Sequence, residues 1–276
     1  MKLLRYGSVG NEKPAILDND GNIRSLTEIV DDIYADELDK LSAVDVTALP
    51  IVSDDVRIGP CVANVGKFIC IGLNYADHAA ESGMELPPEP VIFMKATSAI
   101  CGPNDDVIKP HGSTKLDWEV ELGVVVGKEL RYASEEEAAD AIAGYCVIND
   151  ISERAFQLEM SGQWVKGKSN DTFGPIGPYL VTPDEVDDPD NLKMWLEVNG
   201  HRYQDGNTKT MVYKPAFTLA YLSKFMSLQP GDVISTGTPP GVGLGQTPPT
   251  YLDVGDVMEL GIEDLGSQKQ TVVVAE

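Results

Sequence analysis

Three acidic side chains alternate along the stretch LDWEVELGVVVG, residues 116–127. Asp117, Glu119 and Glu121 take odd positions, and apolar residues take the even ones. Successive side chains of a strand point to opposite faces, so a strand here would gather the three carboxylates on one side. That face is either solvated or part of a cation site. The apolar run that follows favours a buried strand, in which a bound cation offsets the cost of burying acids.

A hard divalent cation such as Mg²⁺ needs more oxygen ligands than two carboxylates on one strand supply. Asp150 is the best candidate for a third protein ligand, because it ends the apolar segment GYCVIND, residues 144–150. Glu119, Glu121 and Asp150 are therefore the predicted cation ligands. Asp117 lies at the entrance of the strand and is predicted to be either a neighbour of the site or a solvated residue.

Two further segments carry side chains that could act on a substrate. In NYADHAAESG, His78 and Glu81 have the i, i+3 spacing that places both on one face of a helix, where the carboxylate can orient the imidazole as a general base. The alternative is a surface helical pair. In QWVKGKSNDTFGPIGP, Lys168 precedes a turn and an apolar strand and is predicted to point inward, whereas Lys166 is predicted to be solvated.

The segment DVISTGTPPGVGLG, residues 232–245, ends an apolar strand in Thr236, Gly237 and Thr238. Hydroxyls and exposed backbone N–H groups at such a strand end can hold a carboxylate. The segment is not a phosphate-binding loop, because no GK[ST] follows, and Pro239 with Pro240 blocks the helix that a dinucleotide-binding motif needs. The alternative is an ordinary surface turn.

The elements that must position these residues are mostly strands. Apolar segments separated by turns, with 26 Gly and 18 Pro in the chain, favour a strand-dominated α+β domain over alternating βαβ units. One helix is predicted from Ser134 to Gly144, where Ser134 and Glu137 form a capping box, and another from Pro215 to Met226. Residues 1–65 are short strands and a charged stretch, predicted as a small N-terminal domain before a catalytic domain in residues 66–276.

The composition limits the classes of partner. The formal net charge of -23 repels nucleic acid and anionic membranes, so a small anionic substrate needs a metal, a lysine or an arginine in its site. The four cysteines show no metal-binding or disulfide spacing. The first residues, MKLLRYGSVGNEKP, lack the apolar run of a signal peptide, and a cytoplasmic protein is expected.

Six motifs in this order together resemble the fumarylacetoacetate hydrolase family: GLNYADHAAE, VIFMK, DWEVELGVVVG, INDISERAFQ, KGKSNDTFGPIGP and GDVISTGTPPGVG. The resemblance covers roughly residues 66–276. It implies a β-rich roll of mixed sheets, usually paired into homodimers and often preceded by a small N-terminal α+β domain.

The resemblance also implies roles for individual residues. The metal ligands are Glu119, Glu121 and Asp150, with Mg²⁺ the usual ion and Mn²⁺ or Ca²⁺ as substitutes. The residues that act on water or substrate are His78 and Glu81 as the water-activating pair, Lys168 as the catalytic lysine, and Arg154, Gln157, Gly237 and Thr238 as substrate contacts. Leu73 stands where several acylpyruvase-like members have an arginine that reads a substrate carboxylate, so such a carboxylate is read differently here or is absent.

The implied reaction is metal-dependent hydrolysis of a carbon–carbon bond in a 2,4-diketo acid, which releases pyruvate and a small acid. Within the family, the runs WVKGKSNDTFGPIGP and FMSLQPGDVISTGTPPGVGLG are most similar to bacterial hydrolases of 2,4-diketo-3-deoxy-L-fuconate, enzymes of sugar-acid breakdown. The alternatives are an isomerase or decarboxylase of a 2-hydroxyhepta-2,4-diene-1,7-dioate type of substrate, a ureidoglycolate lyase-like activity, and a non-catalytic acidic protein that binds cations loosely.

Overall fold

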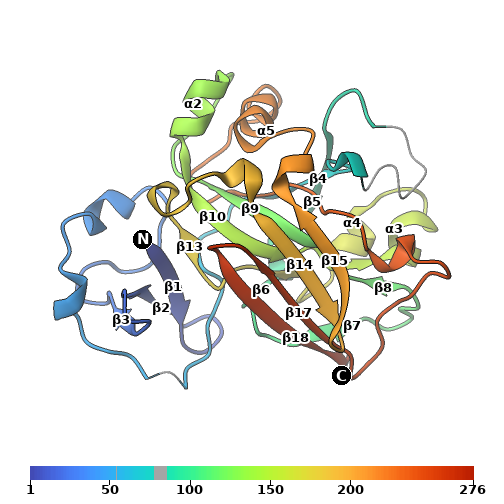
Figure 1. Cartoon of the computed structure of the whole chain (residues 1–276), viewed down its shortest axis with the longest axis horizontal. Helices are drawn as coiled ribbons and strands as arrows, with labels where there is room; N and C mark the ends of the chain where they lie inside the picture. Colours follow the sequence, from blue (N-terminus) through green and yellow to red (C-terminus); the bar gives the residue numbers. More distant parts are fainter. Residues whose placement is uncertain (54, 78–85) are drawn as a thin grey trace.

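The computed structural model describes residues 1–53, 55–77 and 86–276, and strands form most of its regular structure (Figure 1). The sheets are mixed: β16 pairs with β4 in parallel, whereas most other neighbours are antiparallel. This strand-rich α+β architecture confirms the predicted fold class. No helix in the described residues is long and apolar enough to cross a membrane.

The larger sheet has nine strands in the described part of the chain. Their order is β3 (Ile23–Ser25), β2 (Lys13–Leu17), β1 (Lys2–Tyr6), β13 (Leu180–Val181), β10 (Ile142–Asn149), β9 (Val120–Val126), β16 (Val233–Ser235), β4 (Phe68–Gly72) and β5 (Val91–Lys95). The strand β9, which carries the alternating acids, therefore lies near the middle of this sheet.

A second sheet packs against the first. Its order is β15 (His201–Asn207), β14 (Lys193–Val198), β17 (Val257–Ile262), β18 (Gly266–Val274) and β7 (Val107–Lys109). Two short ribbons complete the strands: β11 (Ser152–Glu153) with β8 (Leu116–Asp117), and β12 (Gly174–Pro175) with β6 (Ile100–Cys101).

The alternation along β9 divides its side chains between two environments. Leu122 and Val124 belong to the main core between the two sheets, together with Leu196 and Leu260 of the second sheet. Val125, on the opposite face, belongs to a second core that the N-terminal residues cover. Both faces of β9 are thus buried, which explains its near-continuous apolar sequence.

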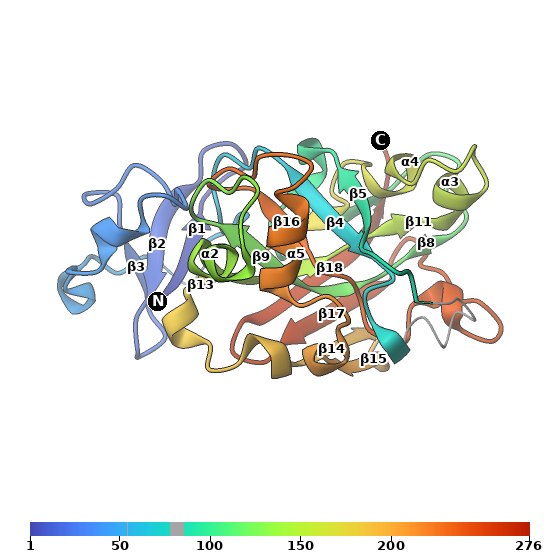
Figure 2. The same cartoon turned by 90° about the horizontal axis from the view of Figure 1, so that it is seen from above.

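The first strands extend the nine-stranded sheet rather than forming a sheet of their own. Strand β1 pairs with β13, with Lys2 opposite Val181. The N-terminal residues lie at one end of the molecule, and α3 (Arg154–Leu158) and α4 (Val165–Lys168) lie at the other end (Figure 2). The division of the chain at residue 65 stays a prediction.

The two helices expected from the sequence are shorter than predicted. Helix α2 spans Glu135–Asp140, and Ser134 and Glu137 form the predicted capping box. It ends four residues before the predicted Gly144, because Ile142 already pairs with Val126 in the sheet. Helix α5 spans Pro215–Leu222, and the remaining predicted residues to 226 form turns.

Candidate active site

The acidic stretch does not form one continuous strand, because strand pairing is interrupted at the site. Strand β8 ends at Asp117 and β9 begins at Val120, so Glu119 lies between them. The opposite chain is interrupted at the same level, between β10 and β11, and Asp150 lies in that gap. The Asp150 N–H donates to the Glu119 carbonyl oxygen at 2.9 Å. The two matching gaps bring the two carboxylates beside each other.

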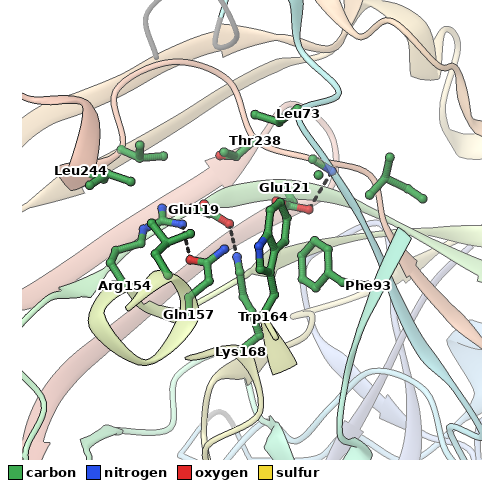
Figure 3. Close-up of a pocket in the computed structure, with 15 residues that line it drawn as sticks. Leu73, Phe93, Glu119, Glu121, Arg154, Gln157, Trp164, Lys168, Thr238 and Leu244 are labelled. Atoms are coloured by element: carbon green, nitrogen blue, oxygen red, sulfur yellow. Dashed lines mark hydrogen bonds and ion pairs between the residues drawn. The ribbon is translucent and has the colours of Figure 1, made fainter. Parts of the chain in front are cut away.

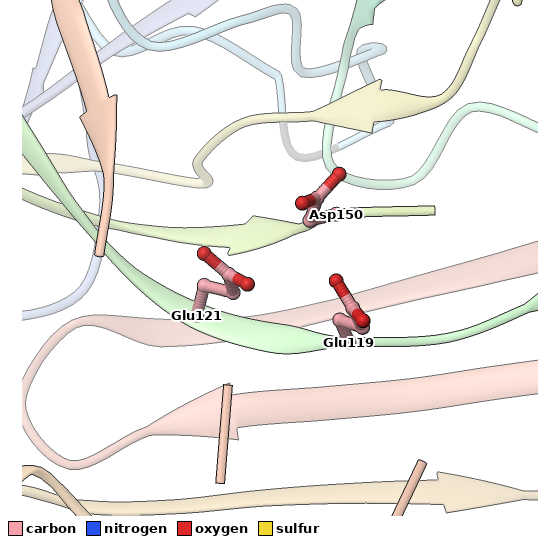
Figure 4. Close-up of side chains that lie close together, drawn as sticks. All are labelled: Glu119, Glu121 and Asp150. Atoms are coloured by element: carbon pink, nitrogen blue, oxygen red, sulfur yellow. The ribbon is translucent and has the colours of Figure 1, made fainter. Parts of the chain in front are cut away.

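The three predicted cation ligands lie together. One carboxylate oxygen from each of Glu119, Glu121 and Asp150 can be chosen so that all three lie within 4.8 Å of one another (Figure 4). Their exposed fractions are 6%, 2% and 0%. The alternative of a solvated acidic face is therefore wrong, and the described residues present a buried acidic cluster of the kind that can hold a divalent cation.

Buried cationic side chains surround this cluster. Lys168, at the end of α4, donates to Glu119 at 2.6 Å and to Asp150 at 2.8 Å, as expected of an inward-pointing lysine. Lys95, the last residue of β5, donates to the other oxygen of Asp150 and to the Ile151 carbonyl at 2.9 Å. Lys95 is not among the site residues predicted from the sequence. Its position at the end of the apolar strand VIFMK is the signal that could have identified it.

Asp117 and Arg154 extend the network on one side. Arg154 donates to Asp117 at 2.8 Å and to Glu119 at 2.6 Å. Asp117 is fully buried, and it also accepts the backbone N–H groups of Gly243 and Leu244, at 2.6 and 2.9 Å. Asp117 is therefore a neighbour of the site, and the prediction that it could be solvated is wrong.

The electrostatic environments of the two glutamates differ. Burial alone would raise the pKa of Glu119, but the positive charges of Arg154 and Lys168 lower it well below its usual value. Burial raises the pKa of Glu121, and the negative charges of Asp150 and Glu119 raise it further. Glu119 is thus ionised at neutral pH, whereas Glu121 is disfavoured as an anion unless a cation lies beside it.

Glu121 has the environment expected of a cation ligand. Its Oε2 accepts from the Ser235 hydroxyl at 2.6 Å and the Gly237 N–H at 2.7 Å. Its Oε1 has no hydrogen-bond partner among the described residues, although the side chain is almost fully buried. A divalent cation would satisfy this oxygen, so the residues present fit such an ion.

The segment after β16 holds a carboxylate, as its sequence predicts, but the carboxylate is that of Glu121. Thr238 donates its hydroxyl to the Val120 carbonyl at 2.9 Å and accepts from the Gln204 amide at 2.8 Å. These contacts fix the segment to β9. Gly237 and Thr238 nevertheless line the cavity above Glu121, where a substrate can also reach them.

A cavity of about 180 Å³ opens over the acidic cluster (Figure 3). Arg154 and Gln157 of α3 lie on one side, and Gln157 accepts from Arg154 at 3.0 Å. Phe93 and Trp164 lie on the other side, and Leu73 also lines the cavity. The predicted pair His78 and Glu81 lies outside the described residues.

Replacing Gly237 with alanine is expected to lower the free energy of unfolding by about 1–3 kcal/mol. Gly237 has φ +100°, and an added Cβ would lie 2.8 Å from the Asn74 Cβ. Gly255→Ala is the control, because Gly255 has φ +95° and nothing within 4 Å of the added Cβ. Urea unfolding of both variants separates the contact from the backbone strain, and an equal loss in both would contradict the role of the contact.

The sequence profile of the C-terminal domain of fumarylacetoacetate hydrolases matches residues 67–273. The chain belongs to the fumarylacetoacetate hydrolase family. A relative in Burkholderia multivorans that is named a hydrolase is 61% identical over 276 residues, with 98% of each chain covered.

Solved structures of this family share the fold over the whole chain. Fumarylacetoacetate hydrolase from Exiguobacterium antarcticum is similar with a TM-score of 0.89 and 35% identity, and 100% of each chain is covered. Maleylpyruvate hydrolase from Sphingobium sp. SYK-6, solved with a manganese ion and pyruvate, has a TM-score of 0.84, 27% identity and the same coverage. The 2-hydroxyhepta-2,4-diene-1,7-dioate isomerase from Mycobacterium marinum has a TM-score of 0.79 and 32% identity, and 99% of this chain and 98% of that one are covered.

Proposed function

We propose that this protein is a divalent-metal-dependent hydrolase that cleaves a carbon–carbon bond in a 2,4-diketo acid and releases pyruvate and a small acid. The observation that carries the proposal is the buried cluster of Glu119, Glu121 and Asp150, with Lys168 beside it, at the floor of a small cavity. The bound pyruvate and manganese ion in the related maleylpyruvate hydrolase support this choice of product and of ion class.

Glu119, Glu121 and Asp150 would hold the ion, proposed to be Mg²⁺ with Mn²⁺ or Ca²⁺ as substitutes. When bound, such a cation supplies Lewis-acid polarisation of a keto oxygen. When Glu121 is ionised, as it would be beside a bound cation, the four carboxylates of the buried network, which include Asp117, exceed its three cationic side chains by one negative charge. A divalent cation reverses this excess and so prepares the site for an anionic substrate.

Lys168 is proposed to stabilise negative charge rather than to donate a proton. Burial alone would lower the pKa of Lys168, but Asp150 and Glu119 raise it above its usual value. An ammonium with a raised pKa stays charged at neutral pH and is a poor acid there. Its position over Glu119 and Asp150 places this charge next to the reacting carbonyl groups. His78, oriented by Glu81, is proposed as the base that activates water.

The test is a direct product analysis of the purified protein with 2,4-dioxohexanoate. Hydrolysis is expected to give equal amounts of pyruvate and propionate, by chromatography with mass detection. An excess of EDTA is expected to abolish turnover, and added Mg²⁺ or Mn²⁺ is expected to restore it. Full turnover in EDTA would contradict the metal dependence.

The related isomerase from M. marinum supports a second candidate, isomerisation or decarboxylation of a dienoic diacid of the 2-hydroxyhepta-2,4-diene-1,7-dioate type. Product mass separates the candidates. Hydrolysis splits the substrate into two acids, decarboxylation removes carbon dioxide, and isomerisation leaves the mass unchanged. Turnover of the diacid without cleavage, together with no pyruvate from any 2,4-diketo acid, would favour the second candidate.

A further inference from the structure

We propose that the acyl tail of the substrate, the part beyond C4 of the 2,4-diketo acid, is a short hydrocarbon chain without a hydroxyl or a second carboxylate. The inference rests on the proposed function, because it places the diketo acid head at the acidic floor. The tail then lies along the remaining walls of the same cavity. These walls determine which tails the site accepts.

The walls beyond the acidic floor are mostly apolar, apart from Arg154, Gln157 and Thr238. They come from segments far apart in the sequence: the end of β4, strand β5, helices α3 and α4, and the turn after β16. Their apolar side chains are Ile71, Leu73, Phe93, Leu158, Trp164, Val242 and Leu244. A cavity of about 180 Å³ lies below the usual range for drug-sized ligands of roughly 300–1,000 Å³ and suits a small acid.

A second carboxylate on the tail would find no free cation among the described residues that line the cavity. Arg154 and Lys168 are the cationic side chains among the described residues that line the cavity. Arg154 already pairs with Asp117 and Glu119. Lys168 already pairs with Glu119 and Asp150. Leu73, which also lines the cavity, is apolar and offers no charge, and an unpaired buried carboxylate is costly.

A hydroxyl on the tail would find few partners. The Thr238 hydroxyl proton is used by the Val120 carbonyl, and the Gln157 carbonyl oxygen accepts from Arg154. The remaining side-chain N–H donors of the described lining residues, outside the charged pairs, are the Gln157 amide and the Trp164 indole. The Gln157 side chain is bonded to Arg154, which also donates to Glu119, so it lies near the acidic floor, where it would meet the diketo head rather than the tail.

Trp164 forms a wall that packing holds in place. Its ring meets Phe93 edge to face, with centroids 5.2 Å apart. It also lies against Gly72, where an added Cβ would come within 2.7 Å of the ring. Phe93 in turn faces Lys168, whose Nζ is 5.1 Å from the Phe93 centroid. The aromatic wall thus begins at the charged floor and continues toward the opening, as a hydrocarbon tail requires.

A hydrocarbon tail differs from the tail of the substrate that the sequence resemblance favours. The diketo acid 2,4-diketo-3-deoxy-L-fuconate carries a hydroxyl on C5, the first carbon of its tail. The matched hydrocarbon acid is 2,4-dioxohexanoate, which differs by that hydroxyl alone. For a longer tail, 2,4-dioxoheptanoate and 2,4-dioxoheptanedioate differ by a terminal carboxylate.

The test compares kcat/KM for pyruvate release from these four acids at a fixed Mn²⁺ concentration. We expect 2,4-dioxohexanoate to exceed its 5-hydroxy analogue by about 10-fold, because a hydroxyl in an apolar site loses its hydrogen bonds to water. We expect 2,4-dioxoheptanoate to exceed the dicarboxylate by at least about 100-fold, because an unpaired charge is more costly to bury. Calorimetry with N-propyloxamate and N-(2-carboxyethyl)oxamate measures the same preference in binding alone.

The variants Leu158→Gln and Met160→Gln form a matched pair. The two residues are 49% and 45% exposed and lie two positions apart, but Leu158 lines the cavity and Met160 does not. We expect Leu158→Gln to reduce the preference for 2,4-dioxohexanoate over its 5-hydroxy analogue at least about 3-fold, because glutamine offers the hydroxyl a partner. Met160→Gln is expected to retain the preference. Leu244→Gln provides a second, independent change at the opening.

The outcomes separate the two proposals. No pyruvate from any of the four acids overturns the proposed function and this inference with it. Pyruvate release with equal or better use of the 5-hydroxy acid or the dicarboxylate overturns the inference alone. If the wild-type protein prefers the hydroxylated acid and Trp164→Phe abolishes that preference, the inference alone is overturned. The indole N–H is then identified as the partner of the hydroxyl.

Discussion

Replacing Arg154 with methionine is expected to lower the free energy of unfolding by about 3–5 kcal/mol in metal-free buffer, because removing one partner of a buried ion pair leaves the others uncompensated. Arg154 is 5% exposed and donates to both Asp117 and Glu119. Methionine fills much of the same space but leaves these two carboxylates beside each other without the guanidinium. Urea unfolding monitored by tryptophan fluorescence measures the loss.

Arg202→Met is the control for the loss of an arginine. Arg202 also forms a pair with a carboxylate, that of Glu197, but its side chain is 44% exposed. An exposed pair contributes roughly 0–1 kcal/mol, so this variant is expected to unfold at nearly the wild-type urea concentration. If the free energy of unfolding falls by a similar amount in the two variants, burial does not explain the contribution of Arg154 to stability.

Replacing Glu121 with glutamine is expected to weaken divalent cation binding by more than about 100-fold, since loss of a residue that only supports a ligand already costs roughly 10–100-fold. The fold is expected to remain intact. Burial and the charges of Asp150 and Glu119 raise the pKa of Glu121, so in the absence of a cation the carboxyl favours its neutral form. The glutamine carbonyl can accept from Ser235 and Gly237 as the carboxylate does. Calorimetric titration with Mn²⁺ measures the affinity, and unchanged binding would contradict the ligand assignment.

Glu119→Gln gives the contrasting result that makes this test specific. Glu119 is ionised in the folded protein and pairs with Lys168 and Arg154. Its loss is expected to reduce both cation binding and stability in EDTA, whereas Glu121→Gln reduces binding alone. Because the pKa of Glu119 is lowered on folding, its contribution to stability is present above its unfolded-state pKa and is lost as the pH falls toward the folded-state pKa. An equal effect of both variants on stability would show that the two glutamates do not differ as described.

Local patterns in the sequence predict the features that depend on neighbouring residues. The capping box of Ser134 and Glu137 needs only three residues of spacing, and it forms as expected. The common side of Glu119 and Glu121 follows from the alternation of a strand. The end of the first helix was predicted too far along the chain, because sheet pairing at Ile142 outweighs the helix preference of the preceding segment.

The contacts of the site that local patterns did not predict join residues far apart in the sequence. Lys95 contacts Asp150 although three strands, β9, β16 and β4, lie between β10 and β5 in the order of the sheet. The contact of Asp117 with Gly243 joins residues 126 positions apart. No spacing in the sequence reports such a contact, and the alternation alone leaves Asp117 free to be buried or solvated.

At the floor of the cavity, Glu121 lies in β9, and Glu119 and Asp150 directly adjoin the ends of β9 and β10, whereas the apolar walls come largely from short helices, strand ends and turns. Substitutions in the walls are expected to change the accepted tail without moving the carboxylates, because Leu158, Trp164 and Leu244 lie in segments outside β9 and β10. Such a scaffold is suited to divergence after gene duplication, and to laboratory selection from small libraries at positions 158, 164 and 244. A library that included 119, 121 or 150 is instead expected to contain fewer members that fold or that bind the proposed cation.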